Sequence, residues 1–178
     1  MKTKMTLILA TVLLFAGCDL VKDAAEVDII TDLTANIPVV VTGDKSGNAD
    51  VDLLALPFSK SHVLTLGANE DVQPYIDQIR RINLLSLEGY VTGLIQGQTI
   101  NSMSLDVTGV GTITTVTNIT SANSTFFPEV LPDILDDVEE LLKKVREVTL
   151  VVHGNASGPM TFTVTCIFDT KITAGALD

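Results

Sequence analysis

Apolar and polar residues alternate over a long stretch that begins at Val27. Up to Val41, the odd-numbered positions are mostly apolar and the even-numbered positions are mostly polar. A period of two places alternate side chains on opposite faces of an extended chain. The pattern therefore predicts one long half-buried strand, or two strands with a bend. Pro38 has no N–H to donate to a neighbouring strand, which indicates a sheet edge or a kink at that position.

Further strands are predicted wherever the alternation returns. They cover residues 51–58, 62–66, 85–95, 103–107, 148–152 and 160–172, with a break at Pro57 and a turn at Ser157, Gly158 and Pro159. In the last strand, Thr161, Thr163 and Thr165 are expected to face outward. One buried and one solvated face is typical of antiparallel sheets. The expected fold class is therefore mostly β, an antiparallel β-sandwich or open barrel.

Two amphipathic helices are predicted between the strands. The first has one apolar face, made by Val72, Tyr75, Ile76, Ile79 and Ile82. Asp71 is its expected N-cap, which places Pro74 in the first turn. The second helix runs from Leu131 to Val145, with acidic residues early and basic residues late, as the helix dipole favours. Both apolar stripes are expected to cover a sheet face or close one end of the sandwich.

The first residues have the organisation of a leader peptide. Lys2 and Lys4 precede a mainly apolar run from Met5 to Phe15. This run is too short to cross a bilayer, which takes roughly 20 apolar residues. We therefore interpret residues 1–17 as a signal peptide, residues 18–25 as an acidic tether and residues 26–178 as a single β-rich domain.

The end of the leader carries the most specific motif in the chain. Leu14-Phe15-Ala16-Gly17-Cys18 resembles the cleavage box of bacterial lipoprotein precursors. The resemblance implies cleavage before Cys18, with a diacylglycerol on its thiol and an acyl chain, such as palmitate, on its new amino group. Two or more acyl chains would anchor the protein stably to a membrane, because a single chain binds only marginally. The alternative is a secreted protein with a coincidental cysteine.

A second resemblance bears on localisation. The hydropathy pattern around Asp71, Tyr75 and Ile79 is similar to that of uncharacterised β-rich lipoproteins of Bacteroidetes-type bacteria. The resemblance implies an envelope with two membranes and implies no activity. Asp19 directly after the lipidated cysteine would mean inner-membrane retention by enterobacterial sorting rules, but it can accompany surface export in Bacteroidetes-type species. The outer membrane, at its periplasmic or surface face, is favoured over the inner membrane.

The charge of the chain excludes one class of partner. The sequence has 11 basic and 22 acidic residues, and loss of residues 1–17 removes two lysines, which leaves a formal charge of −13. Nucleic acids require a basic footprint, so no nucleic-acid partner is expected. The same charge argues against peripheral docking on anionic lipid. Contact with the membrane is expected through the lipid anchor instead.

Little in the chain indicates catalysis. His62 and His153 are the two possible imidazole bases, and neither lies in a nucleophile motif, although Ser157 follows His153 by four residues. Cys166, the one cysteine left after acylation, lies on the apolar face of an alternating run and is expected to be buried and inert rather than a reactive thiol. The two histidines are far apart in the sequence and only this cysteine accompanies them, so no zinc site is expected. We expect no enzymatic activity and no cofactor beyond the covalent lipid.

One loop has oxygen-bearing side chains at alternate positions, namely Asp44, Ser46, Asn48, Asp50 and Asp52. Calcium takes six to eight oxygen ligands, so this loop is a weak calcium candidate. An EF-hand-type loop would have Gly and Glu where this sequence has Ala49 and Ala55. A polar hairpin loop is the competing interpretation.

Two functions from different classes fit these features. The first is a membrane-anchored envelope lipoprotein whose β-sandwich serves as a non-catalytic interaction or structural module, with a possible envelope protein as partner. The alternative is a carrier of a lipid or other apolar ligand, because long strands and two amphipathic helices could enclose a cavity and 46% of the residues are hydrophobic. Native mass spectrometry separates the two, since a carrier would retain its lipid after gentle extraction.

Overall fold

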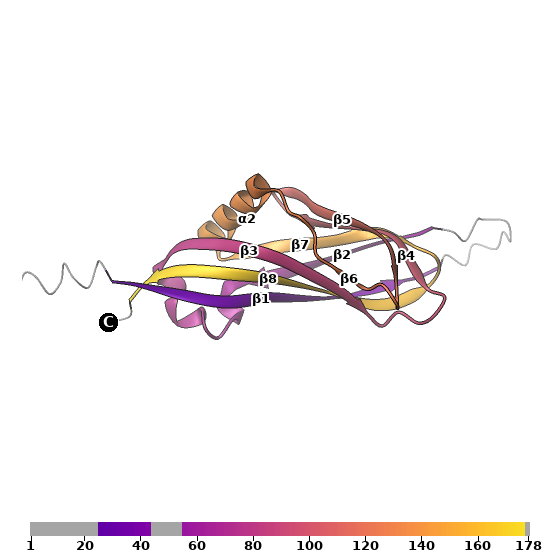
Figure 1. Ribbon diagram of the computed structural model, residues 1–178, viewed down its shortest axis with the longest axis horizontal. Helices are drawn as coiled ribbons and strands as arrows, with labels where there is room; N and C mark the ends of the chain where they lie inside the picture. Colours follow the sequence, from indigo (N-terminus) through magenta and orange to yellow (C-terminus); the bar gives the residue numbers. More distant parts are fainter. Residues whose placement is uncertain (1–24, 44–54, 177–178) are drawn as a thin grey trace, which may run out of the picture.

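The computed structural model describes residues 25–43 and 55–176, which form two antiparallel four-stranded sheets with few helices. In the first sheet the strand order is β1 (Glu26–Val41), β8 (Met160–Gly175), β3 (Ile79–Thr92) and β6 (Thr125–Phe126). In the second it is β2 (Leu56–Thr65), β7 (Glu147–Ala156), β4 (Thr99–Val107) and β5 (Gly111–Thr120). The sheets do not close into a barrel, which is consistent with the expected sandwich. The strands run along the long axis of the molecule (Figure 1).

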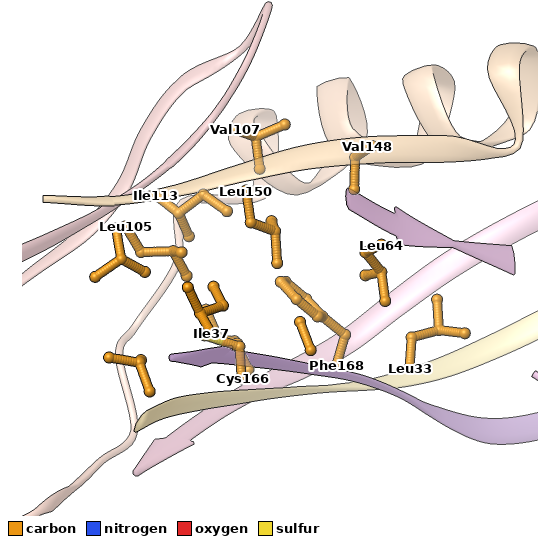
Figure 2. Packing of buried hydrophobic residues seen from close by; sticks show 14 of the residues in the cluster. Leu33, Ile37, Leu64, Leu105, Val107, Ile113, Val148, Leu150, Cys166 and Phe168 are labelled. Carbon is orange, nitrogen blue, oxygen red and sulfur yellow. The ribbon is translucent and has the colours of Figure 1, made fainter. Parts of the chain in front are cut away.

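The core lies between the two sheets. Leu33, Ile37 and Phe168 of the first sheet point toward Leu64 and Leu150 of the second (Figure 2). Every one of these side chains is at most 6% exposed. The alternation in the sequence creates this layer, because each strand contributes every second residue to the inner face.

The longest predicted strand is confirmed as one continuous element. β1 pairs with β8 without any shift in register, from Glu26 opposite Gly175 to Val41 opposite Met160. The alternative of two strands with a bend is therefore wrong. The prediction that Pro38 marks a sheet edge is confirmed, because no strand of residues 25–43 and 55–176 pairs with the other side of β1.

The first predicted helix is wrong. Residues 66–68 and 73–78 form two short 3-10 helices, η1 (Leu66–Ala68) and η2 (Gln73–Gln78), and β3 already begins at Ile79. A register shift between Ile79 and Arg81 puts Ile79 and Ile82 on the same buried side of β3, although they are three residues apart. This bulge gives a strand the apolar spacing of a helix. The mostly β fold class therefore holds with one amphipathic α-helix in the described part of the chain, not two.

Asp71 is not the N-cap of either short helix. The residue before η2 is Val72, which makes no side-chain cap, and Pro74 lies in the first turn as predicted. Asp71 instead accepts a hydrogen bond from the hydroxyl of Thr31 at 3.2 Å. The Asn69 carboxamide oxygen accepts bonds from the backbone N–H groups of Asp71 and Val72, so it is Asn69 that organises the turn.

The second predicted helix is confirmed as α2 (Pro132–Val145), which contacts β3 and β7. Val138 and Leu142 are its fully buried residues. Glu139 reaches the edge of β3, where its carboxylate accepts a bond from the backbone N–H of Leu84 at 2.7 Å. Burial raises the pKa of Glu139, and the bond from Leu84 opposes that rise. The helix therefore supplies a hydrogen-bond acceptor for a backbone N–H at the edge of β3.

Several strand predictions need correction. The predicted segment 51–58 lies partly outside the described residues, which resume at residue 55. Within them, the predicted break between residues 58 and 62 is absent, because residues 56–65 form the single edge strand β2, in which Pro57 is accommodated at the second position. Strands β5 and β6 were not predicted. Thr165 lies on the outer face of the sheet as predicted, opposite Asn36, but it is buried there between β1 and β3, and its hydroxyl donates to Asn36 at 2.8 Å. The turn at residues 157–159 is confirmed, and it joins the two sheets.

Candidate functional site

The outer face of the second sheet gathers polar side chains from all four of its strands. The pairing registers place Ser59, His153, Ser104 and Thr115 in one row across β2, β7, β4 and β5. Residues opposite each other in adjacent antiparallel strands have Cβ atoms roughly 4.5–5.5 Å apart. We call these four residues the polar row. None of its residues lines the three grooves that are described below.

His153 is held by a carboxylate beside this row. Its Nε2 lies 3.0 Å from Oδ2 of Asp106, and the two side chains are 44% and 30% exposed. The other oxygen of Asp106, Oδ1, is buried and has no hydrogen-bond partner among the residues that the structure describes. The Asp106 carboxylate orients the imidazole and would form an ion pair with it when the imidazole is protonated.

The hydroxyl groups near His153 bond elsewhere. The hydroxyl of Ser104 shares a 2.8 Å hydrogen bond with Thr115, while Ser157 accepts a 3.0 Å bond from the backbone N–H of Thr99. Within residues 25–43 and 55–176, no hydroxyl donates to the imidazole of His153. Nucleophilic catalysis requires a nucleophile within hydrogen-bond reach of its base. Among the described residues, His153 is an oriented base with no such hydroxyl bonded to it.

The other residues considered from the sequence are not brought into this site. His62 is half-buried on β2, where its register partner is Leu150. Cys166 is completely buried, as predicted, and burial raises the pKa of its thiol to about 12. A thiol with that pKa is almost entirely protonated at neutral pH and is inert.

The lipidation candidate Cys18 and the calcium candidates Asp44, Ser46, Asn48, Asp50 and Asp52 lie outside the described residues. In the part of the chain that the structure describes, no group of three or more His, Cys, Asp or Glu side chains could hold a metal ion. No helix in this part is long and apolar enough to cross a membrane.

Three open grooves lie away from the polar row. One, of about 300 Å³, runs between α2 and β3 and is lined mostly by charged groups, among them Arg81, Glu139 and Lys143. Another, of about 340 Å³, lies between α2 and the β4–β5 turn. The third, of about 180 Å³, lies between β1 and the end of β2. None of these three is an enclosed apolar cavity of the kind that would hold a lipid chain.

Sequence reasoning missed the pairing of His153 with Asp106. The alternation of strand 103–107 already indicated that Asp106 faces outward. It gave no register, however, and the two residues are 47 positions apart in the chain. Only the pairing of β4 with β7 brings them together.

Comparison with known proteins adds little to this geometry. No protein-family model and no curated protein matches the chain. Among solved structures it is similar to the decameric BFDV capsid protein, with a TM-score of 0.42 and 8% identity over 83% of this chain and 99% of that one. It is also similar to Desmodium yellow mottle tymovirus, with a TM-score of 0.37 and 9% identity over 84% and 91% of the two chains. The Nora virus structure gives a TM-score of 0.40 and 14% identity over 86% and 61%. Likenesses this weak carry no argument about function.

Proposed function

We propose that the protein is a lipid-anchored lipoprotein of a bacterial cell envelope and that its β-sandwich is a non-catalytic interaction or structural module. One observation carries the proposal. A short apolar run ends in Leu14-Phe15-Ala16-Gly17-Cys18, the pattern of a lipoprotein cleavage box. The outer membrane is the proposed location, and the acyl chains on Cys18 are the proposed contact with it.

The proposed mechanism is tethering. An anchor confines the domain to the membrane surface, which raises its effective concentration for any neighbour in the same layer without a new contact. The non-catalytic part of the proposal is supported by the surroundings of His153, where Asp106 orients the imidazole and no described residue bonds a hydroxyl or thiol to it. The apolar-carrier alternative remains a prediction from composition, and no contact among the described residues favours it.

The two cysteines allow a matched test of the anchor. We expect labelled palmitate to enter the wild-type chain and the Cys166→Ala variant, and not the Cys18→Ala variant. Globomycin, which blocks cleavage of lipoprotein precursors, should leave the full-length precursor in wild-type cells. The proposal fails if Cys18→Ala keeps its membrane partitioning and if the wild-type N-terminal peptide carries no acyl mass.

Location is tested separately. Membrane fractionation should place the acylated chain with the outer membrane, and protease treatment of intact cells should distinguish the surface face from the periplasmic face. Recovery in the inner-membrane fraction would overturn the location and leave the anchor standing.

A further inference from the structure

The proposed anchor residue lies close in the sequence to the first strand of the domain. Only seven residues separate Cys18 from Glu26, the first residue of β1. β1 is an edge strand, and its sole strand partner in the described part of the chain is β8. Any pull that enters through the tether therefore passes first into the β1–β8 ladder.

The direction of that pull decides how the ladder responds. Interstrand hydrogen bonds of an antiparallel pair lie perpendicular to the strands. A force along β1 from its N-terminal end is therefore shared by all 16 residues of the strand, which must slide together past β8. A force applied between Glu26 and Gly175, which lie opposite each other at one end, opens the pairs one after another.

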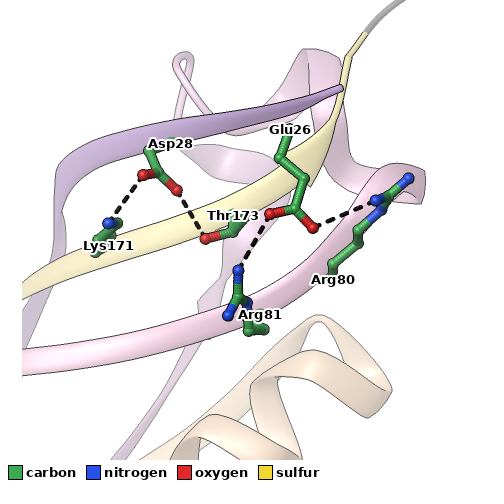
Figure 3. Close-up of polar contacts among 6 residues, drawn as sticks. All are labelled: Glu26, Asp28, Arg80, Arg81, Lys171 and Thr173. Carbon is green, nitrogen blue, oxygen red and sulfur yellow. Dashed lines mark hydrogen bonds and ion pairs between the residues drawn. The ribbon is translucent and has the colours of Figure 1, made fainter. Parts of the chain in front are cut away.

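The end of the ladder that takes the pull first is reinforced by side chains (Figure 3). The carboxylate of Glu26 lies 3.3 Å from Arg80 and 3.1 Å from Arg81, both on β3. These two ion pairs reach across β8 and join β1 to the third strand of the sheet. Exposed ion pairs contribute little to the free energy of unfolding, but these fix the first register positions of β1.

Neighbouring contacts extend the reinforcement. Asp28 lies 2.9 Å from Lys171 and accepts a 2.8 Å bond from the hydroxyl of Thr173, both on β8. The backbone N–H of Ala176 donates to the carbonyl of Ala25, so backbone bonding continues one residue beyond β1. The bonds from Lys171 and Thr173 hold the pKa of Asp28 below its usual value, which keeps the carboxylate charged.

We propose that β1 is a shear-resistant attachment strand, through which the anchor holds the folded domain when a bound partner pulls on it. The inference rests on the proposed lipid anchor for its biological meaning. The mechanical property itself belongs to the strand geometry. It can be measured whether or not the protein is acylated.

Single-molecule pulling on the full chain tests the proposal. Cell-free synthesis without the acylating enzymes leaves Cys18 as a natural thiol handle, and Cys166 is buried and does not compete for the coupling reagent. The second handle is Gly158→Cys for one chain and Asp178→Cys for the other. Gly158 lies just before β8 at the far end of the ladder, and a Cβ added there meets no atom within 4 Å. Pulling between Cys18 and residue 158 loads the β1–β8 ladder from opposite ends, in shear. Pulling between Cys18 and residue 178 loads it from the same end and opens the pairs one after another.

We expect the Gly158→Cys chain to unfold at a force several-fold higher than the Asp178→Cys chain at the same loading rate. Glu26→Gln should lower the unzipping force more than the shearing force, because unzipping breaks the Glu26 contacts alone at its first step. Equal forces in the two geometries would overturn the proposal, and so would a shearing force below the unzipping force. Loss of acylation in cells would remove the anchor and leave these force measurements unchanged, so the two failures are distinguishable.

Discussion

Replacing Gly154 with alanine should push two strands of the second sheet apart. Gly154 lies on β7 opposite Met103 of β4. A Cβ at this position would lie 2.9 Å from the Cα of Met103 and closer still to the carbonyl oxygen of Ser102. Both atoms belong to the backbone, so no side-chain rotation can relieve the overlap. The sequence pattern places Gly154 between the predicted strand 148–152 and the turn at 157–159, and it does not indicate this contact.

The size of the effect follows from the distances. Ordinary van der Waals contact begins near 3.4 Å, so β4 must withdraw by at least about 0.5 Å at Met103. Overpacking of this kind costs about 1–3 kcal/mol. Each backbone hydrogen bond that lengthens beyond its normal range adds about 1 kcal/mol. We expect Gly154→Ala to lower the free energy of unfolding by about 2–4 kcal/mol.

Urea unfolding followed by circular dichroism, in a common Cys18→Ala background, measures this change. Gly67→Ala is the matched control, because its added Cβ meets no atom within 4 Å and its backbone does not adopt a positive φ. The control should be neutral or stabilising by about 0.4–1 kcal/mol, since alanine restricts the unfolded chain. If Gly154→Ala and Gly67→Ala unfold at the same urea concentration with equal slopes, the close approach of β4 and β7 is refuted.

Three further predictions concern ionisation, burial and the sheet edge. Because the pKa of Glu139 is raised above its ordinary value of 4.5, its contribution to stability is complete below that value and is lost as the pH rises through the folded-state pKa. Glu139→Gln, which still accepts from Leu84, should therefore gain stability relative to wild type as the pH rises above 4.5, and a pH-independent difference between the two unfolding curves would contradict this. In the Cys18→Ala chain, Cys166 should fail to react with a thiol reagent at pH 8 until urea unfolds the protein, and rapid labelling of the native chain would show that the thiol is accessible. Pro38→Thr supplies an N–H at the open edge of β1 and should make the protein associate with rising concentration in sedimentation velocity, whereas wild-type-like sedimentation would mean that Pro38 does not protect the edge.

The sequence predicts those elements whose apolar residues follow the ideal period of their structure. β1 keeps a period of two without a bulge, and α2 keeps its apolar stripe with Asp133 in its first turn and Lys143 and Lys144 in its last. In both elements the local preference and the buried face agree. Their type could therefore be predicted without knowledge of the partners.

Bulges explain why the sequence pattern did not reveal β5 or the start of β3. In β5 the buried or partly buried residues Ile113, Val116 and Ile119 are spaced by three. A register shift opposite Leu105 and Asp106 and a positive φ at Asn118 allow this spacing in a strand. At the start of β3, the shift between Ile79 and Arg81 likewise gives the buried residues a spacing of three. An irregularity in one strand is set by its neighbour, and a single strand's pattern does not contain that information.

The candidate site likewise depends partly on the pattern within each strand and partly on how neighbouring strands pair. That Ser104, Asp106 and His153 lie outward can be predicted from alternation alone. Their meeting depends on the register of β4 against β7, and a shift of one residue would send each side chain to the other face.

The sheet edges bear on how a tethered domain could bind a partner. Confinement to a surface raises the concentration of each copy near the others, and an open strand edge would then promote aggregation. On β1, Pro38 has no N–H to offer, and the backbone carbonyl of Asp32 accepts a bond from the side chain of Asn69. On β2, Pro57 lies near the start, and Lys60 occupies a core-facing register position while remaining exposed.

The remaining edges are protected by other means. Much of β3 is covered by α2 and by β6, with Glu139 accepting from the backbone N–H of Leu84. β5 is interrupted near its start by the bulge opposite Asp106 and near its end by Asn118 in the left-handed region. Each described edge strand thus has a feature that hinders the addition of another strand. A protein partner of the proposed anchored domain is therefore expected to bind the faces or loops of the domain. The polar row around His153 is then the surface to substitute first in a binding assay.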